Sequence, residues 1–195
     1  MEEKRLERNT LIALLSINTF MFFFELALGL IAQSTGLLAD SLDMLADAFV
    51  YGLSLYAVGK AVAKKASAAR VSGYLQILLG IGVLFEVLRR LLLGSEPQSM
   101  LIIVVGIVAL LANIVCVALI AKHRSGGVHM RASWIFSVND VLANLGVILS
   151  GCLVAILGSR YPDLLIGMII SMLVVRGGIQ IVREAREAEK PVQKP

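Results

Sequence analysis

The chain has 195 residues, of which 58% are hydrophobic and only 16% are charged, and its mean hydropathy is +0.85. Soluble domains carry charge on about a quarter of their residues, so this composition excludes an ordinary soluble domain. The net charge of +4 does not identify a nucleic-acid partner, because the basic residues gather at the ends of apolar blocks.

Six apolar blocks follow one another along the chain and predict six membrane-spanning helices. A span needs about 20 mostly apolar residues to cross about 30 Å of hydrocarbon. The blocks cover Thr10–Ala32, Gly36–Ala57, Val71–Leu93, Met100–Ala121, Ala132–Leu157 and Leu164–Val182. The loops between them are too short for a soluble domain. We therefore expect residues 1–195 to form one all-α, polytopic membrane domain, with residues 183–195 as a short cytoplasmic tail.

Basic residues mark one side of the predicted bundle. They precede the first block, lie after the second and the fourth, and follow the sixth: Lys4, Arg5, Arg8, Lys60, Lys64, Lys65, Arg70, Lys122, Arg124, Arg131, Arg183, Arg186, Lys190 and Lys194. Cytoplasmic loops of membrane proteins carry such an excess of Lys and Arg. Both termini are therefore expected in the cytoplasm, and the compact form suggests a bacterial inner membrane. This placement also argues against a nucleic-acid partner.

The second block contains three aspartates within the stretch LLADSLDMLADAFVYGL, which runs from residue 37 to residue 53. A carboxylate at the centre of a span costs about 2.5–3.5 kcal/mol on insertion scales. Asp43 and Asp47 are four residues apart, which places them on one helix face with about 5–6 Å between their Cβ atoms. Asp40 lies three residues earlier on the same stripe. The predicted helix therefore presents one acidic face.

The fifth and first blocks supply further polar groups. Asp140 is the only charged residue of the fifth block, and Asn144 follows one turn later on the same face. Asn139 is adjacent in sequence but lies about 100° round the helix. The first block contributes Asn18, together with Glu25 nearer the outer end of that span.

The depths of these groups in the membrane can be compared at 1.5 Å per residue. Asp43 and Asp47 lie about 10 and 16 Å below the outer end of the second span. Asp140 and Asn144 lie about 12 and 18 Å above the inner end of the fifth span. In a slab of about 30 Å, Asp140 is therefore level with Asp47, and Asn18 joins that level. The groups converge near the midplane if spans one, two and five pack together.

A cluster of carboxylates in the membrane interior requires a counter-charge. Protons can neutralise it, because neighbouring carboxylates disfavour each other's ionisation, and a divalent cation can do so through oxygen ligands at about 2.0–2.2 Å. A site that holds either one can exchange a metal for protons. Polar groups also join membrane helices by hydrogen bonds alone, but ionisable groups inside a membrane are expensive and mark function by default. Glu25 is open to both interpretations.

The ordered set of polar and glycine residues resembles the cation diffusion facilitator family of divalent-metal transporters. The resemblance covers nearly the whole chain and rests on Asn18, Glu25, Gly29, Ser34, the segment LLADSLDMLADA, Arg89, Arg90, Asn113, the segment NDVLANLGV and Asp163. It implies a six-helix bundle with both termini inside.

The resemblance also implies a tetrahedral metal site between spans two and five, built from two His/Asp-x-x-x-Asp pairs. The first pair maps onto Asp43 and Asp47, and the aspartate of the second maps onto Asp140. Its partner falls on Phe136, which cannot ligate a metal. A fourth ligand must come from elsewhere. The candidates are Asn144, Asn18, Asn139 or water, and Asp40 is a secondary candidate for metal contact.

The first position of each pair can be a histidine in the family, but this chain has Asp43 and Phe136 there. The absence of an imidazole ligand changes the expected metal preference. Carboxylate and carbonyl oxygens suit Mn, Mg or Ca better than imidazole does, while imidazole suits Zn, Cu, Fe and Ni. The preference is therefore expected to be broad or shifted, with manganese, iron or cobalt beside zinc, and proton coupling would fall to the aspartates. The loop histidines His123 and His129 could receive metal on the cytoplasmic side, although unremarkable solvated histidines are the more ordinary interpretation.

The leading hypothesis is a secondary active transporter that exports a divalent cation of the Zn, Mn, Co, Fe or Cd class in exchange for protons. The alternative is a non-transporting, degenerate relative that acts as a membrane partner or metal sensor. No prosthetic group is expected. The protein is not expected to be an enzyme, because the sequence shows no nucleophile–base arrangement. Family members commonly carry a cytoplasmic domain after span six; none is expected here, so a homodimer would form through the membrane spans.

Overall fold

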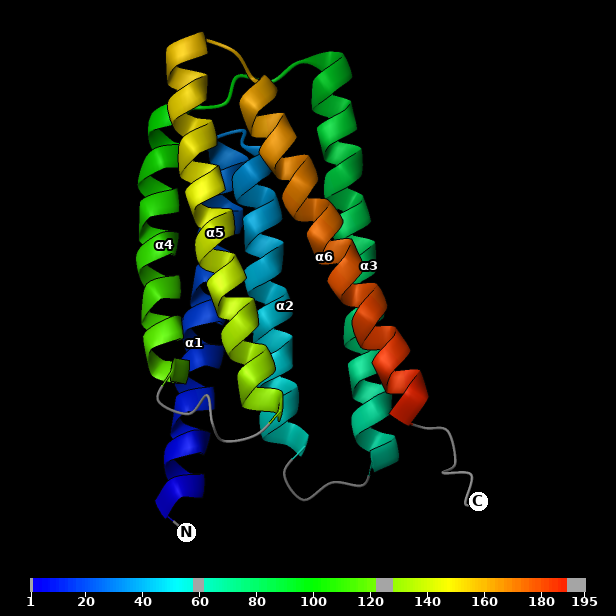
Figure 1. Cartoon of the computed structure of the whole chain (residues 1–195). Coiled ribbons are helices and arrows are strands. Elements are labelled where there is room, and N and C mark those ends of the chain that lie inside the picture. The colour runs from blue at the N-terminus through cyan, green and yellow to red at the C-terminus, as the bar shows by residue number, and fades with distance from the viewer. Residues whose placement is uncertain (1, 58–61, 122–127, 189–195) are drawn as a thin grey trace.

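The computed structural model describes residues 2–57, 62–121 and 128–188, and it forms six helices (Figure 1). Their bounds are α1 Glu2–Ile31, α2 Thr35–Ala57, α3 Val62–Leu93, α4 Ser99–Ala121, α5 Val128–Leu157 and α6 Tyr161–Ala188. One helix covers each predicted block, and the described residues contain no strand. The prediction of an all-α, six-helix membrane fold is confirmed.

Length and composition qualify five of the helices as membrane spans. They are α1, α3, α4, α5 and α6, and α4 is the most apolar of them. The remaining helix, α2, is long enough, but it carries Asp40, Asp43 and Asp47 between its second turn and its middle. The acidic stripe is thus what sets α2 apart from its neighbours, and its place in the bundle decides how those charges are accommodated.

The helices pack as three close pairs, and α2 is the helix that contacts all the others. The pairs are α1 with α2, α4 with α5, and α3 with α6, and α2 also packs against α3, α4, α5 and α6. Figure 1 shows that α1 begins and α6 ends at the same end of the bundle, which we call the terminal end. The α1–α2, α3–α4 and α5–α6 turns lie at the opposite end, which we call the turn end.

Glycines let the helices of two of these pairs approach closely. A Cβ atom on Gly73 of α3 would lie 2.9 Å from the carbonyl oxygen of Gly178 in α6, and a Cβ on Gly178 would lie 2.8 Å from the Gly73 oxygen. In the α4–α5 pair, a Cβ on Gly106 would lie 2.9 Å from Ile148. Small residues are the usual contact points of membrane helices, because burial in lipid supplies no hydrophobic drive for association.

At the turn end, a single carboxylate fastens α6 to the start of α2. Asp163, in the first turn of α6, accepts hydrogen bonds from the backbone N–H groups of Thr35 and Gly36 at 2.7 and 3.1 Å. It also accepts from the hydroxyls of Ser34 and Thr35. The Ser34 hydroxyl in turn accepts from the backbone N–H of Leu37. The N-terminus of α2, whose N–H groups lack partners within the helix, is therefore satisfied by another helix. We call this the Asp163 latch.

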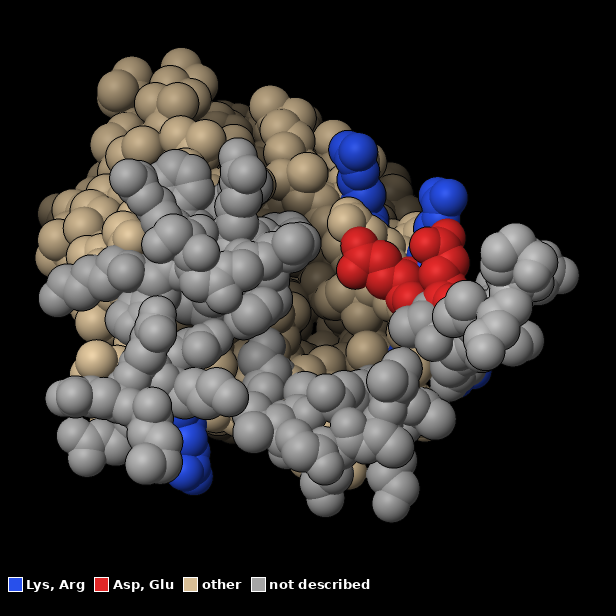
Figure 2. All heavy atoms as spheres, turned by 60° about the horizontal axis from the view of Figure 1, so that its bottom comes forward, with Lys and Arg blue, Asp and Glu red and all other residues tan. Residues whose placement is uncertain are grey.

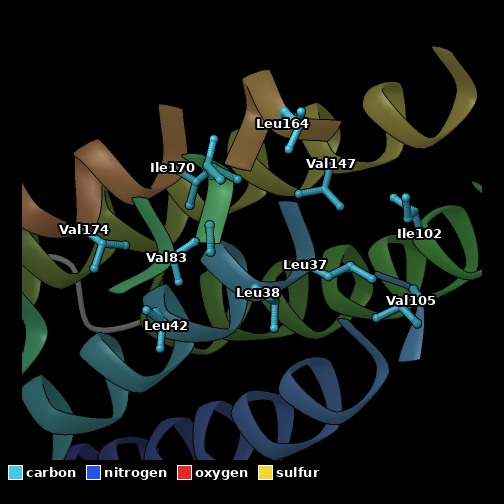
Figure 3. Packing of buried hydrophobic residues seen from close by; sticks show 13 residues of the cluster. Leu37, Leu38, Leu42, Val83, Ile102, Val105, Val147, Leu164, Ile170 and Val174 are labelled. Carbon is cyan, nitrogen blue, oxygen red and sulfur yellow. The ribbon is translucent and has the colours of Figure 1, made fainter. Parts of the chain in front are cut away.

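The largest cluster of buried apolar side chains surrounds the first half of α2. Leu37, Leu38 and Leu42 of α2 meet side chains from α3, α4, α5 and α6 (Figure 3). Their partners include Val83, Ile102, Val105, Val147, Leu164, Ile170 and Val174. Close packing of this kind leaves little room for water, so the core seals the bundle on the side of the turn end.

The terminal end has a different surface. Figure 2 looks onto this end and shows acidic side chains at one side with basic side chains beside them, another basic side chain away from this group, and a hollow near the middle of the face. Near the end of α6, Arg183 pairs with Glu187 at 3.2 Å, with both side chains largely exposed. Such exposed pairs contribute little to stability, and the charges mark a surface that meets water.

Candidate functional site

The two halves of α2 differ in how far they are enclosed. Every residue from 34 to 42 is buried, whereas from Asp43 onward buried and half-buried positions alternate. Asp40 is 1% exposed, and Asp43 and Asp47 are both half-buried. The acidic stripe therefore crosses the boundary between the sealed half of the helix and the half that opens toward the terminal end.

Three carboxyls from α2 and α5 lie against one another at this boundary. The Asp140 carboxyl lies within hydrogen-bonding distance of the Asp43 carboxyl and of the Asp47 carboxyl. Each such hydrogen bond requires a proton on one of the two groups. The Tyr51 hydroxyl, one turn along α2, donates to Asp47 Oδ2 at 3.0 Å and holds that carboxyl in place. We call Asp43, Asp47 and Asp140 the central carboxyls.

The central carboxyls are close in pairs but do not form a finished ligand sphere. Among the side chains that the structure describes, no three His, Cys, Asp or Glu residues are already arranged to hold one metal ion. Divalent cations need oxygen ligands at about 2.0–2.2 Å. Binding of a cation would therefore require these side chains to rotate toward a common point.

Two of the predicted amide ligands are buried with a free oxygen. Asn144 is fully buried, its Nδ2 donates to the Asp140 carbonyl at 2.8 Å, and no described group donates to its Oδ1. Asn18 is also buried, its Nδ2 donates to the Leu14 carbonyl at 2.9 Å, and its Oδ1 likewise has no donor among the described residues. An amide oxygen without a donor is available as a ligand.

The structure decides how Asn18 lies relative to the central carboxyls, because the sequence left open whether spans one, two and five pack together. Among the described residues, α1 packs against α2 and α4 but does not contact α5. Asn18 Nδ2 lies 3.7 Å from Sγ of Cys116 in α4, and Cys116 lies close enough to Asp47 to feel its charge. Asn18 thus approaches the central carboxyls from the α4 side. Asn139 is exposed, as its position round the helix predicts.

Asp40 has a different partner from the other aspartates of α2. Its carboxyl lies within hydrogen-bonding distance of the Glu25 carboxyl on α1. Glu25 is fully buried, and none of the four carboxyl oxygens of this pair has an N–H or O–H donor in the described part of the chain. The structure thus pairs Asp40 with a residue for which the sequence left two interpretations open.

The side chains of three residues of the sequence interpretation are not described. The backbone of α5 runs through His129 and Phe136, but the side chains of residues 122–137 are not among those described, and His123 lies between the described ranges. The departure at Phe136 therefore rests on the sequence. Sequence reasoning in turn missed Tyr51, although its position four residues after Asp47 on an acidic helix was an available signal.

The whole bundle matches a known family. Residues 11–188 match the family described as the cation efflux transmembrane domain, which covers most of the chain. The chain therefore belongs to the cation efflux, or cation diffusion facilitator, family, and the resemblance seen in the sequence is confirmed. It is an integral, multi-pass membrane protein.

Individual relatives are distant. A cadmium, cobalt and zinc/H(+)-K(+) antiporter from Bacillus velezensis is 25% identical over 120 residues, which are 60% of this chain and 38% of the relative. The protein of the same name from Bacillus subtilis is 24% identical over 60% of this chain and 39% of its own. The zinc transporter ZitB from Yersinia pseudotuberculosis is 23% identical over 60% of this chain and 38% of its own. The match thus spans less than two fifths of each relative's length.

Proposed function

We propose that the protein is a secondary active transporter that exports a divalent metal cation from the cytoplasm in exchange for protons. The observation that carries this proposal is the meeting of Asp43, Asp47 and Asp140 inside an apolar bundle. No basic side chain is among the groups found to act on these carboxyls in the described part of the chain. Their charge must therefore be balanced by something that enters from outside.

The proposed substrate ligands are the three central carboxyls and an amide oxygen. Asn144 and Asn18 each keep a buried, unused Oδ1 near this region, and either one can replace the ligand missing at Phe136. The exposed Asn139 is a poor candidate, and Asp40 is engaged with Glu25. A set made only of oxygen atoms discriminates less strongly in favour of zinc than a set with imidazole, so manganese, iron and cobalt are proposed as substrates beside zinc.

The relatives support the same substrate class. Their names state transport of cadmium, cobalt and zinc, and two of them name protons and potassium as the exchanged ions. Transport by alternating access would need the central carboxyls to face each side of the membrane in turn. The enclosed start and half-open second part of α2 correspond to a state that faces the terminal end.

Two further expectations concern the protein's setting. The terminal end is proposed to face the cytoplasm of a bacterial inner membrane, as the Lys and Arg pattern predicts. The protein is also proposed to form a homodimer through its membrane spans. Reporter fusions at each terminus test the orientation, and cross-linking between cysteines on the outer face of α3 tests the dimer.

Transport into liposomes with an imposed pH gradient tests the proposed function. We expect uptake of Zn²⁺, Mn²⁺, Co²⁺ and Fe²⁺ by the wild type and its loss in Asp47→Ala and Asp140→Ala. Asn139→Ala is the matched control, because it alters a polar side chain directly beside Asp140 that is exposed. If no metal moves, or if both aspartate variants transport normally, the transporter proposal fails. Metal binding without transport would instead favour the alternative of a sensor or partner protein.

A further inference from the structure

We propose that Glu25 and Asp40 form a proton-binding site separate from the central carboxyls, in which the two side chains share one proton. Glu25 lies on α1 and Asp40 on α2, and their carboxyls face each other across the closely packed interface of these two helices. The contribution of this site to coupling rests on the proposed antiport. The sharing of the proton does not.

The burial of the pair is complete. Glu25 is 0% exposed and Asp40 is 1% exposed. One turn beyond Glu25, a Cβ atom on Gly29 would lie 3.1 Å from Leu37 Cβ and 3.2 Å from the backbone nitrogen of Leu38. The helices are therefore pressed together beside the pair, and the two carboxyls cannot turn to water while this contact holds.

No protein group satisfies the pair. Within the described residues, neither oxygen of Glu25 and neither oxygen of Asp40 receives a hydrogen bond from an N–H or O–H group. Two carboxylates without protons cannot hydrogen-bond to each other, because both only accept. The only hydrogen bond that their placement allows is one with a proton between them. A buried polar group left without any partner would cost about 1–3 kcal/mol, and more when it is charged.

Among the side chains that the structure describes, no basic group is found to act on the pair. The groups that act on it electrostatically are acidic, Asp43 on α2 and Asp140 on α5. The sequence of α4, from residue 99 to residue 121, contains no charged residue. On α3, Arg90 pairs with Glu86 at 2.6 Å, and on α6, Asp163 is taken up by the start of α2. A cation from solution must therefore balance the charge.

Position suggests what the shared proton does. Asp40 lies three residues before Asp43, which is about 4.5 Å along the helix axis toward the turn end. The pair thus stands between the central carboxyls and the turn end, on the sealed side of the bundle. A proton held there lies on the route from the turn end to Asp43, and so the pair is placed to deliver the coupling proton while the central carboxyls take the metal.

The first test is infrared spectroscopy of the purified protein at neutral pH, which separates protonated carboxyl from carboxylate absorption. We expect a protonated-carboxyl band in the wild type that is weaker in Glu25→Gln, because the glutamine amide then donates to the Asp40 carboxylate, while protons held among the central carboxyls leave the rest of the band. Glu96→Gln is the matched control, since Glu96 is exposed in the α3–α4 loop at the turn end. A band of equal intensity in all three proteins, or no band in the wild type, would overturn the shared proton.

The second test is metal uptake with and without a pH gradient. Glu25→Gln and Asp40→Asn are expected to lose the acceleration that the gradient gives, while Glu96→Gln keeps it. Two independent variants guard against a folding defect, which thermal unfolding would reveal. If both variants respond to the gradient as the wild type does, the pair has no part in coupling. If the wild type itself moves no metal, the transporter proposal fails, while the infrared result still decides the proton site.

Discussion

The first and second halves of α2 differ in how deeply their side chains are buried. From residue 34 to residue 42 every side chain is buried among α1, α3, α4, α5 and α6, and the Asp163 latch fastens the start of the helix. From Asp43 onward, half-buried positions recur at Leu45 and Asp47. The comparison shows that polar and backbone contacts close the bundle at the turn end. The acidic stripe of α2 therefore begins in the buried half of the helix and ends in the half-buried one.

The seal and the opening have different physical bases. At the turn end, α6 lies so close to α2 that a Cβ atom on Gly167 would meet the Thr35 backbone at 2.7 Å. Beside the second half of α2, a groove of about 490 Å³ lies between α1 and α2. Its lining is largely apolar and includes Phe22 and Phe49. Contacts made by backbone atoms cannot adapt to a change of shape, whereas flexible side chains around a groove can. We therefore expect motion at the second half of α2 before the first.

Removal of the Asp163 carboxylate should loosen the turn end and have the largest effect on the stability of the bundle. Asp163→Ala leaves the donors on Ser34, Thr35 and Gly36 without an acceptor, at about 1–3 kcal/mol each when they stay buried. We expect the free energy of unfolding to fall by about 3–9 kcal/mol, measured by chemical unfolding in detergent micelles. Asp163→Asn keeps one acceptor oxygen and should lose less. Equal stability of Asp163→Ala and the wild type would show that the latch does not hold the turn end.

Thiol modification should show directly that accessibility to water changes along α2 between Asp40 and Asp47. In a background that carries Cys116→Ser and Cys152→Ser, Asp47→Cys should react with a water-soluble reagent much faster than Asp40→Cys. A ratio of about one hundred corresponds to a local opening that costs about 3 kcal/mol. The rates are followed by mass spectrometry after timed quenching. Comparable rates at the two positions would mean that the two halves of α2 are equally open.

Addition of a single methyl group should then separate tight from loose helix contacts. Gly167→Ala forces α6 away from the Thr35 backbone, and overpacking of this kind costs about 1–3 kcal/mol. Gly82 of α3 has nothing within 4 Å of the position of a Cβ atom. Gly82→Ala is therefore the matched control and should be neutral or stabilising by up to about 1 kcal/mol. Thermal unfolding of both variants in the same detergent makes the comparison.

Loss of one hydroxyl in the open half should have the smallest effect. Tyr51→Phe removes the donor that holds Asp47 Oδ2. A neutral hydrogen bond contributes about 0.5–1.5 kcal/mol, so metal affinity should weaken by about two- to tenfold. Calorimetric titration with Mn²⁺ and Zn²⁺ measures the change. If affinity does not change, Tyr51 does not position the carboxyl for the metal.

Much of the site could be predicted because helical periodicity is local. The spacing of Asp43 and Asp47 fixed their common face, and antiparallel spans of known length placed Asp140 level with Asp47, where the structure brings the two carboxyls together. The same reasoning put Asn139 off the site, and its side chain is exposed. The metal-ligand roles of these residues stay predictions. The sequence left open whether spans one, two and five pack together, and among the described residues spans one and five are not in contact, because depth in the membrane does not say which helices are neighbours.

By itself, the sequence predicted six membrane-spanning helices, an acidic face on α2, and the depth of each polar group along its span. These follow from hydropathy, the 3.6-residue period and the rise per residue. Only the tertiary structure decided that Asp40 meets Glu25, that Asn18 meets Cys116, and that Asp163 fastens the start of α2. Each of these contacts joins residues distant in the chain, and their pairing depends on how helices with glycine-lined faces pack against each other.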